Sequence, residues 1–299
     1  MTLPKNDTHR ALLFMFASAM MFGAMAFAAK IAAARLSGPE VAMVRMAFGL
    51  LPVLLVPRWL RSALHVQRVD LILYRGIFGG IAVMLYFMAL QHSSVGVATL
   101  LNYTSPVWSG LMSMLFLRER FSVRVLIPLP IALIGIFLVV HAHASPGEVL
   151  GFGRWELAGA LSAVAGGAAI TAIRAARRTE SSWAVYTSFC FFGMIVNAPL
   201  ALLRWQWPRH DEWLALAATG FLAMGAQLLM TFSLRWLDAM TTGVISQLAV
   251  IMSFILGAVF LHDRVTPAAA LGSALTIGGV IGVIYLTSRF KAAAPEVVT

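Results

Sequence analysis

The chain has 299 residues, of which 60% are hydrophobic and 11% are charged, and its mean hydropathy is +0.86. These values lie far outside the averages of soluble domains, so they exclude a soluble enzyme or binding domain and indicate an integral membrane protein. A net charge of +10 would suggest a nucleic-acid partner in a soluble protein. Here most of the 22 lysines and arginines lie between apolar stretches, where they orient the chain in the membrane, so no nucleic-acid partner is expected.

Ten apolar stretches follow one another along the chain, and each is expected to be a helix that crosses a hydrocarbon core of about 30 Å. The predicted spans are Leu12–Ala34, Val41–Val56, Leu71–Leu90, Val95–Leu117, Val125–Val140, Leu157–Ala175, Trp183–Leu203, Trp213–Leu234, Met240–Leu261 and Ala268–Thr287. The positive-inside rule places both termini in the cytoplasm. The predicted class is therefore an all-α, multi-pass membrane protein with ten transmembrane helices.

The sequence repeats itself at an offset of 144 residues. The segment Phe116–Arg120 reads FLRER, and it returns as FLHDR at Phe260–Arg264. Five predicted spans in each half give the second half the opposite orientation in the membrane, and inverted repeats are typical of secondary transporters. We therefore expect two inverted five-helix repeats, residues 1–144 and 145–299, that form one transmembrane domain around a central cavity.

Neutral polar residues are the first candidates for substrate binding, because no acidic residue or histidine lies in the middle of a predicted span. Asn102 and Tyr103 lie in the fourth span, and the offset maps them onto Ser246 and Gln247 in the ninth. In inverted repeats these pairs flank the midplane, where transporters of this kind bind substrate. The alternative is that they only form hydrogen bonds between helices.

Three further residues are expected to line the cavity, namely Gln227, Tyr86 and Trp108, and the rings of Tyr86 and Trp108 suit a substrate that carries a ring. Ordinary packing is the alternative. Pro106 is expected to kink the fourth helix and to act in gating, because it lacks an N–H. Val250 occupies the matching position in the ninth helix. No catalytic residue, metal site or cofactor is expected.

Arg45 and Arg75 lie about one turn inside predicted spans. Long cationic side chains at this depth usually extend to the lipid headgroups, and Asp70 is close to Arg75 in the sequence. We expect both to do so, with binding of a substrate anion as the alternative.

The runs Val95–Val140 and Ala239–Ile284 resemble the EamA module of the drug/metabolite transporter superfamily. The resemblance rests on Pro106, on the endings Leu117–Arg120 and Leu261–Arg264, and on Gly135 with Gly279. The stretch Asn102–Trp108 is also similar to the YddG-type aromatic amino-acid exporters of bacterial inner membranes. The resemblance implies a basket of helices one to four and six to nine, with the fifth and tenth outside, and export of amino acids or related metabolites.

We expect a monomeric secondary transporter of the bacterial inner membrane that exports aromatic or other neutral amino acids by alternating access. Its expected partners are the small-molecule substrate and the lipid bilayer. Organic-anion or sugar-phosphate antiport is an alternative that requires Lys30, Arg45 or Arg75 to face the cavity, and drug efflux is another. A membrane scaffold without transport activity is the alternative from a different class.

Overall fold

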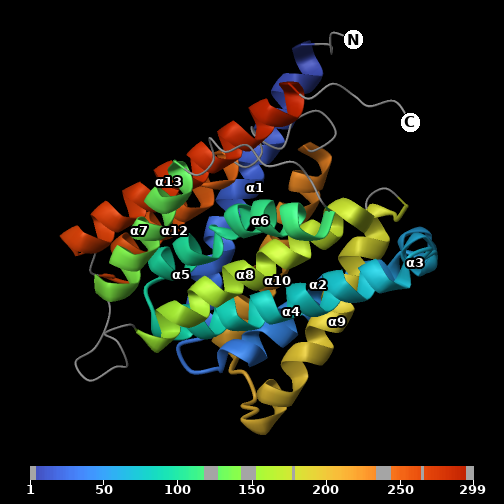
Figure 1. Cartoon of the computed structure of the whole chain (residues 1–299). Helices are drawn as coiled ribbons and strands as arrows, with labels where there is room; N and C mark the ends of the chain where they lie inside the picture. Colours follow the sequence, from blue (N-terminus) through green and yellow to red (C-terminus); the bar gives the residue numbers. More distant parts are fainter. Residues whose placement is uncertain are drawn as a thin grey trace.

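The computed structural model describes residues 5–117, 127–142, 153–176, 179–233, 244–263 and 266–293, and the regular structure within these ranges is helical, with no strand. Figure 1 shows the helices gathered into one bundle with α3 at its edge. The helices are α1 (Lys5–Ala32), α2 (Gly38–Leu55), α3 (Pro57–Leu64), α4 (Val69–His92), α5 (Val95–Asn102), α6 (Ser105–Leu117), α7 (Pro128–Ala142), α8 (Arg154–Ala176), α9 (Ser182–Leu203), α10 (His210–Ser233), α12 (Leu248–Phe260) and α13 (Pro267–Ala293).

Six of the described helices contain a segment long and apolar enough to cross a membrane. These segments are His9–Ala32, Gly38–Leu55, Val69–His92, Arg154–Ile173, Ser182–Leu203 and His210–Met230. Shorter apolar helices are Pro130–Val139, Val244–Phe260 and Pro267–Gly282. The all-helical membrane class is confirmed, and the total of ten spans stays a prediction.

Two local features differ from the predicted spans. The fourth span consists of two helices, because α5 ends at Asn102 and α6 begins at Ser105. The short helix α3 follows α2 directly, after Val56 takes an extended conformation and Pro57 starts a new helix. Proline at the first helical position has the φ angle that a helix needs and lacks only an N–H that would have no partner there.

Glycines at equivalent positions of the two halves make equivalent contacts. Gly76 of α4 packs against Phe192 of α9, and Gly220 of α10 packs against Phe48 of α2. Adding 144 to the numbers of Gly76 and Phe48 gives Gly220 and Phe192, so the two contacts are the same contact with the halves exchanged. The same exchange relates Gly23–Met252 to Gly167–Trp108, and Gly135–Thr276 to Gly279–Ala132. Such reciprocity is the property of an interface with two-fold symmetry.

Helices α7 and α13 are neighbours in Figure 1 and pack mainly on each other. Gly272 lies beside Leu138, and Gly282 lies beside Pro128. Residue numbers therefore rise along α13 as they fall along α7, so the two helices run antiparallel. A two-fold axis that relates two antiparallel helices is perpendicular to them.

The close packing of α13 on α7 predicts that Gly279→Ala and Gly278→Ala have different effects on the stability of the protein. A Cβ at Gly279 would come within 2.5 Å of the Ala132 backbone nitrogen, whereas a Cβ at Gly278 would meet nothing within 4 Å. We expect Gly279→Ala to destabilise the protein by about 1–3 kcal/mol, because the backbones have to separate. Gly278→Ala should be neutral or slightly stabilising, since alanine favours a helix. Thermal unfolding in detergent measures both, and equal melting temperatures would contradict the described packing.

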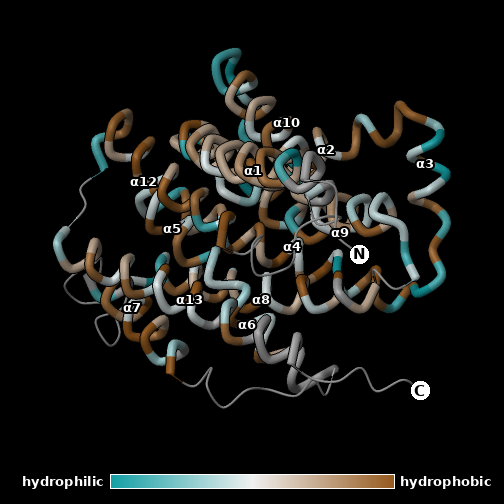
Figure 2. Tube along the Cα trace, turned by 90° about the horizontal axis from the view of Figure 1, so that it is seen from above, coloured by the Kyte–Doolittle hydropathy of each residue, from teal (hydrophilic) through white to brown (hydrophobic). Residues whose placement is uncertain are grey.

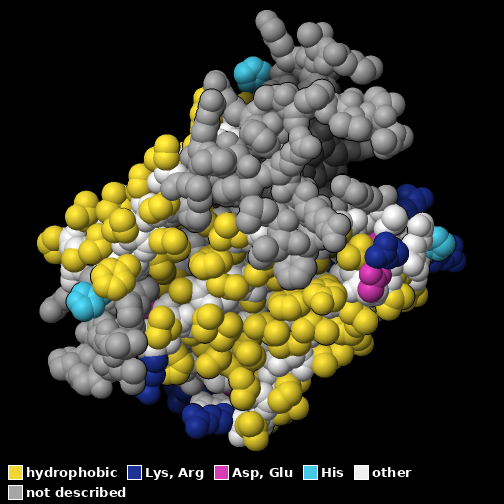
Figure 3. All heavy atoms as spheres, in the orientation of Figure 1, with side chains coloured by type: hydrophobic (Ala, Val, Ile, Leu, Met, Phe, Trp, Pro, Cys, Tyr) yellow, Lys and Arg dark blue, Asp and Glu magenta, His cyan; other side chains and the backbone are white. Residues whose placement is uncertain are grey.

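The outer surface is apolar, as expected for a protein surrounded by lipid. Figure 3 shows hydrophobic side chains over most of the described surface on that face, with lysines and arginines at its margins. Figure 2 shows that hydrophobic residues predominate along many of the helices. Ile134 of α7 and Phe191 of α9 are about half exposed, and Leu214 of α10 is 75% exposed. These side chains need no protein partner when acyl chains cover them.

Candidate functional site

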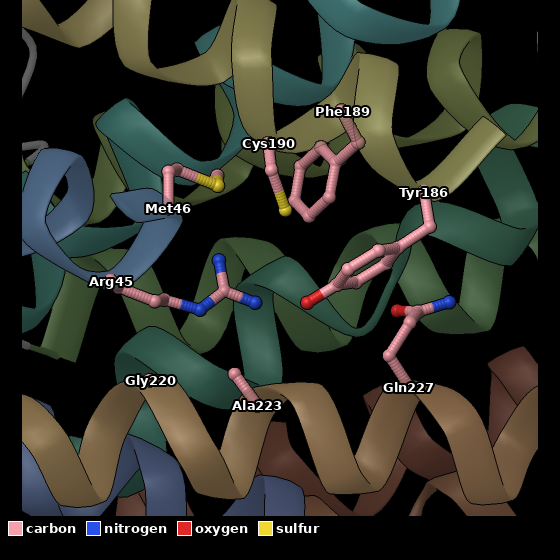
Figure 4. A pocket seen from close by; sticks show the side chains of 8 residues that line it. All are labelled: Arg45, Met46, Tyr186, Phe189, Cys190, Gly220, Ala223 and Gln227. Carbon is pink, nitrogen blue, oxygen red and sulfur yellow. The ribbon is translucent and has the colours of Figure 1, made fainter. Parts of the chain in front are cut away.

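A small cavity lies where α2, α9 and α10 meet, so it has walls from both halves of the chain (Figure 4). Its lining residues are Arg45, Met46, Tyr186, Phe189, Cys190, Gly220, Ala223 and Gln227. Its volume is about 10 Å³. A space of that size holds about one water molecule, whereas sites for small ligands measure about 300–1,000 Å³. In this conformation the cavity is therefore closed around its lining side chains.

Arg45 brings a positive charge to this cavity. It projects from the middle of α2 and is 8% exposed. Figure 4 shows its guanidinium group pointing across the cavity toward the hydroxyl of Tyr186, with Gln227 on the facing helix. Its Cζ lies 5.6 Å from the centre of the Phe189 ring and 5.7 Å from that of Phe87. The aromatic faces attract the cation but accept no hydrogen bond from its buried Nε, which has no partner.

Arg75 of α4 approaches the same aromatic ring. It is 7% exposed, and its Cζ lies 4.1 Å from the centre of the Phe189 ring. Its guanidinium group folds against Gly79 one helical turn later, where any Cβ would overlap it. The position 144 residues after Arg45 is Phe189, so the second half supplies a ring where the first supplies a cation. We call Arg45 and Arg75 the arginine pair. Both contact the ring of Phe189.

The arginine pair has no acidic counterpart in the described part of the chain. The salt bridges found there join Arg35 to Glu212 and Arg68 to Asp70, and neither includes Arg45 or Arg75. The Nε atoms of Arg45 and Arg75 are buried without a hydrogen-bond partner. The expectation that both side chains extend to the headgroups is therefore wrong, because both are buried among helices. Asp70 does not pair with Arg75, since it binds Arg68 through two oxygens at 2.9 and 2.7 Å.

The structure places the predicted neutral polar residues at contacts between helices. Asn102 at the end of α5 donates from Nδ2 to Ser162 Oγ of α8, at 3.0 Å. Gln247 is 3% exposed and donates from Nε2 to the Tyr103 carbonyl, at 3.5 Å. Tyr103 and Gln247 are equivalent under the offset, so the two halves meet here at matching positions. Ser246 precedes Gln247 and is partly buried.

The aromatic candidates occupy different surroundings. Tyr86 is 5% exposed, and its Oη lies 3.0 Å from Thr99 Oγ1. Trp108 packs on Gly167 of α8. Of the residues predicted to bind substrate, Gln227 lines the cavity. Tyr86 and Tyr103 both lie in the neighbourhood of Arg45.

Pro106 is the second residue of α6 and follows the break between α5 and α6. The second half also has a turn at the equivalent place, at Gln247 before α12, although Val250 replaces the proline there. The fold therefore interrupts both helices, with proline in one half and without it in the other.

Sequence reasoning did not select Tyr186, Phe189 and Cys190 as cavity residues, and it gave Arg45 and Arg75 a minor role. A signal was present, because each arginine is followed four residues later by glycine, as Arg45–Gly49 and Arg75–Gly79. That spacing puts a small residue next to the cation on one helical face. Lys30 is not part of the site, since its Nζ donates to the carbonyls of Gln91 at 3.1 Å and Ser93 at 2.7 Å.

Polar contacts join the connecting segments to the start of α10 at one end of the bundle. Arg35, between α1 and α2, donates from Nε to Glu212 Oε1 of α10 at 2.7 Å and from Nη1 to Gln206 Oε1 at 2.8 Å. Buried Glu40 accepts from the Gln206 N–H, at 3.3 Å. The hydrogen bond to Glu212 raises the pKa of Arg35, so its guanidinium stays charged. We call the Arg35–Glu212 pair with Gln206 the end latch.

Among the described residues, no group of three histidine, cysteine, aspartate or glutamate side chains could hold a metal ion. The described chemistry at the centre is therefore that of cationic, hydroxyl, thiol and amide groups.

The sequence profile of the EamA-like transporter family matches the chain twice, at residues 9–141 and 153–285. The chain belongs to this family. The second match begins 144 residues after the first, since 153 − 9 = 144, which is the offset of the internal repeat. The EamA assignment makes the protein a membrane transporter of the drug/metabolite transporter type.

Individual relatives of this EamA protein are distant. It is 28% identical over 265 residues to the pseudopaline exporter CntI of Pseudomonas aeruginosa, covering 88% of this chain and 89% of that one. It is 25% identical over 243 residues to an uncharacterized transporter of Archaeoglobus fulgidus, covering 81% and 85% of the two chains. A solved crystal structure superimposes with a TM-score of 0.60 and 23% identity, covering 94% of this chain and 98% of that one. That similarity shows a shared fold.

Proposed function

We propose that this EamA protein is a monomeric secondary transporter that exports amino acids or related small metabolites across a bacterial inner membrane by alternating access. The observation that carries the proposal is the reciprocity of the contacts between the two halves, together with a central cavity that both halves line. Two equivalent halves around one site can exchange their roles in opening and closing it. Export as the direction is supported by the CntI relative, which is named an exporter.

The proposed topology has ten spans in two inverted repeats, residues 1–144 and 145–299, with both termini in the cytoplasm. The antiparallel course of α7 and α13 supports it, because the two-fold axis is then perpendicular to the helices and lies in the membrane plane. The double family match at the offset of 144 supports the same division.

The closed cavity supports alternating access. A space of about 10 Å³ admits about one water molecule, so α2, α9 and α10 have to separate before a metabolite can bind. The end latch is a suitable element to control that separation, because it joins the start of α10 to the connection between α1 and α2.

Counterflow in proteoliposomes tests the proposal. Vesicles with the purified protein are preloaded with one unlabelled amino acid, and uptake of the same labelled amino acid is followed over time. We expect accumulation with aromatic and bulky neutral amino acids above that of protein-free vesicles, because the site offers aromatic and neutral polar groups. Equal uptake in both vesicle types for every amino acid would contradict the proposed substrates.

The predicted roles of Asn102 and Gln247 can be tested in the same assay. We expect Asn102→Ala and Gln247→Ala to reduce counterflow by about tenfold if these amides bind substrate, since one good hydrogen bond to a charged group is worth about 1.5–3 kcal/mol. Wild-type counterflow with normal expression would instead assign them to the helix contacts seen here.

A further inference from the structure

The arginine pair is a concentration of positive charge that the described protein does not neutralise. Tyr86, Tyr103, Tyr186 and Cys190 are ionisable side chains near Arg45, and Cys190 is near Arg75. In the described part of the chain neither arginine forms a salt bridge. Tyrosine and cysteine side chains are ordinarily neutral near pH 7. Two cations therefore lie close together in a buried place, without an anion from the described residues.

Aromatic contacts do not explain two cations at this place. Burying an unpaired charge in protein or lipid is unfavourable, and charged groups in such places are usually paired or functional. The face of Phe189 attracts both guanidinium groups, but it does not supply the hydrogen-bond acceptors that buried N–H groups need. An anionic group would provide the missing charge and the missing acceptors together.

We infer that the arginine pair is the site for a substrate carboxylate, so that the transported compounds are organic anions or amino acids held by their carboxylate. This inference rests on the proposed function, because it names the substrate class of that same cavity. Arg45 already lines the cavity, and Arg75 contacts the ring of Phe189, which lines the cavity too. The planar guanidinium group forms two parallel hydrogen bonds to a carboxylate, which fixes the orientation of the bound molecule.

The remaining lining residues fit the rest of such a substrate. Tyr186 and Gln227 point toward the space in front of Arg45 and supply neutral donors and acceptors (Figure 4). Phe189 and Met46 supply apolar surface. None of the described residues that line the cavity is acidic, so they include no group that would require an ammonium on the substrate. Removal of the ammonium should therefore be tolerated, and removal of the carboxylate should not.

A matched set of probes tests this inference. L-Phenylalanine has both charged groups, phenylpyruvate has only the carboxylate, and phenethylamine has only the ammonium. Phenyl phosphate adds a different anion on the same ring. Binding is measured as the rise in melting temperature of the detergent-purified protein, and transport as counterflow of each labelled probe. The variants are Arg45→Gln and Arg75→Gln, and Arg68→Gln is the control because Arg68 is exposed.

Phenylpyruvate and phenylalanine are expected to raise the melting temperature and to exchange, and phenethylamine to do neither. Arg45→Gln and Arg75→Gln should each reduce counterflow at least about tenfold, and Arg68→Gln should not. Without ligand the two variants should melt at or above the wild-type temperature, because each loses an unpaired buried charge. Their loss of transport then reflects the site and not unfolding.

Other results separate failure of the site from failure of transport. If phenethylamine binds as well as phenylpyruvate, or if both variants bind phenylpyruvate like the wild type, the carboxylate site is wrong, although flux would still support transport. If no anion raises the melting temperature, the site is also wrong. An arginine-dependent shift without flux of any probe supports the site and contradicts the proposed transport. Preference for phenyl phosphate over both carboxylates would replace the carboxylate with a phosphate ester.

Discussion

Replacing Glu212 with glutamine is expected to increase the rate at which a small thiol reagent modifies Cys190 by about tenfold or more. Glu212 holds Arg35 in the end latch, and the amide keeps its shape but loses the charge attraction. A tenfold change corresponds to a shift of about 1.4 kcal/mol toward the state that is open at this end. Cys190 lines the cavity and is 2% exposed, so its modification reports on opening.

The sequence makes this measurement simple, because Cys190 is the single cysteine of the chain. Cys190→Ala gives the background labelling. Asp70→Asn is the matched control, since it also changes a carboxylate that binds arginine to an amide. The Arg68–Asp70 pair has both side chains more than half exposed, and such surface pairs contribute little. Identical labelling rates in the wild type and Glu212→Gln would show that the end latch does not control access.

Replacing Phe189 with alanine is expected to destabilise the folded protein by about 2–3 kcal/mol. Phe189 is 7% exposed and packs with Met46, Leu50 and Cys190. Removing a buried ring usually costs about 3–5 kcal/mol, and we take a lower figure because lipid is as apolar as the protein interior. The change also removes the ring that both guanidinium groups contact.

Phe191→Ala is the control for this prediction, because Phe191 lies on the same helix and is 50% exposed. We expect it to change the melting temperature little. Phe189→Leu separates the contribution of apolar packing from that of the cation–π contacts, because leucine retains much of the volume but has no aromatic face. If Phe189→Ala and Phe191→Ala have the same melting temperature, the packing of Phe189 does not stabilise the protein as described.

The end latch, Phe189 and the arginine pair would act in different steps of the proposed transport cycle. The end latch would control access to the cavity, and Phe189 would hold the two guanidinium groups in place. The arginine pair would bind the carboxylate of the substrate. Phe189 comes from the second half and the arginines from the first. A movement of one half against the other would therefore change the distance between the ring and both charges, which links substrate binding to the opening of the cavity.

Several properties of this protein can be read from the sequence. Composition and apolar stretches indicate a helical membrane protein, because a span needs a run of apolar residues and little else. The repeat at 144 residues and the motif at Phe116–Arg120 indicate the family, which the double match confirms. Glycines 144 residues apart, such as Gly76 and Gly220, are the places where helices approach closely.

Which residues line the cavity depends on how each helix is rotated about its axis. The hydropathy of this sequence does not indicate that rotation. In a soluble protein the apolar face of a helix points inward, but in lipid both faces are apolar. Sequence reasoning therefore favoured polar positions such as Asn102 and Gln247, which the fold places in contacts between helices.

The sequence by itself determined the membrane class, the helical composition, the internal repeat and the family, because these follow from composition and spacing along the chain. Only the tertiary structure decided that Arg45 and Arg75 are both buried near the ring of Phe189. The contacts with Phe189 join helices that are far apart in the sequence. Close packing selects them, and the pattern of apolar residues does not specify that packing.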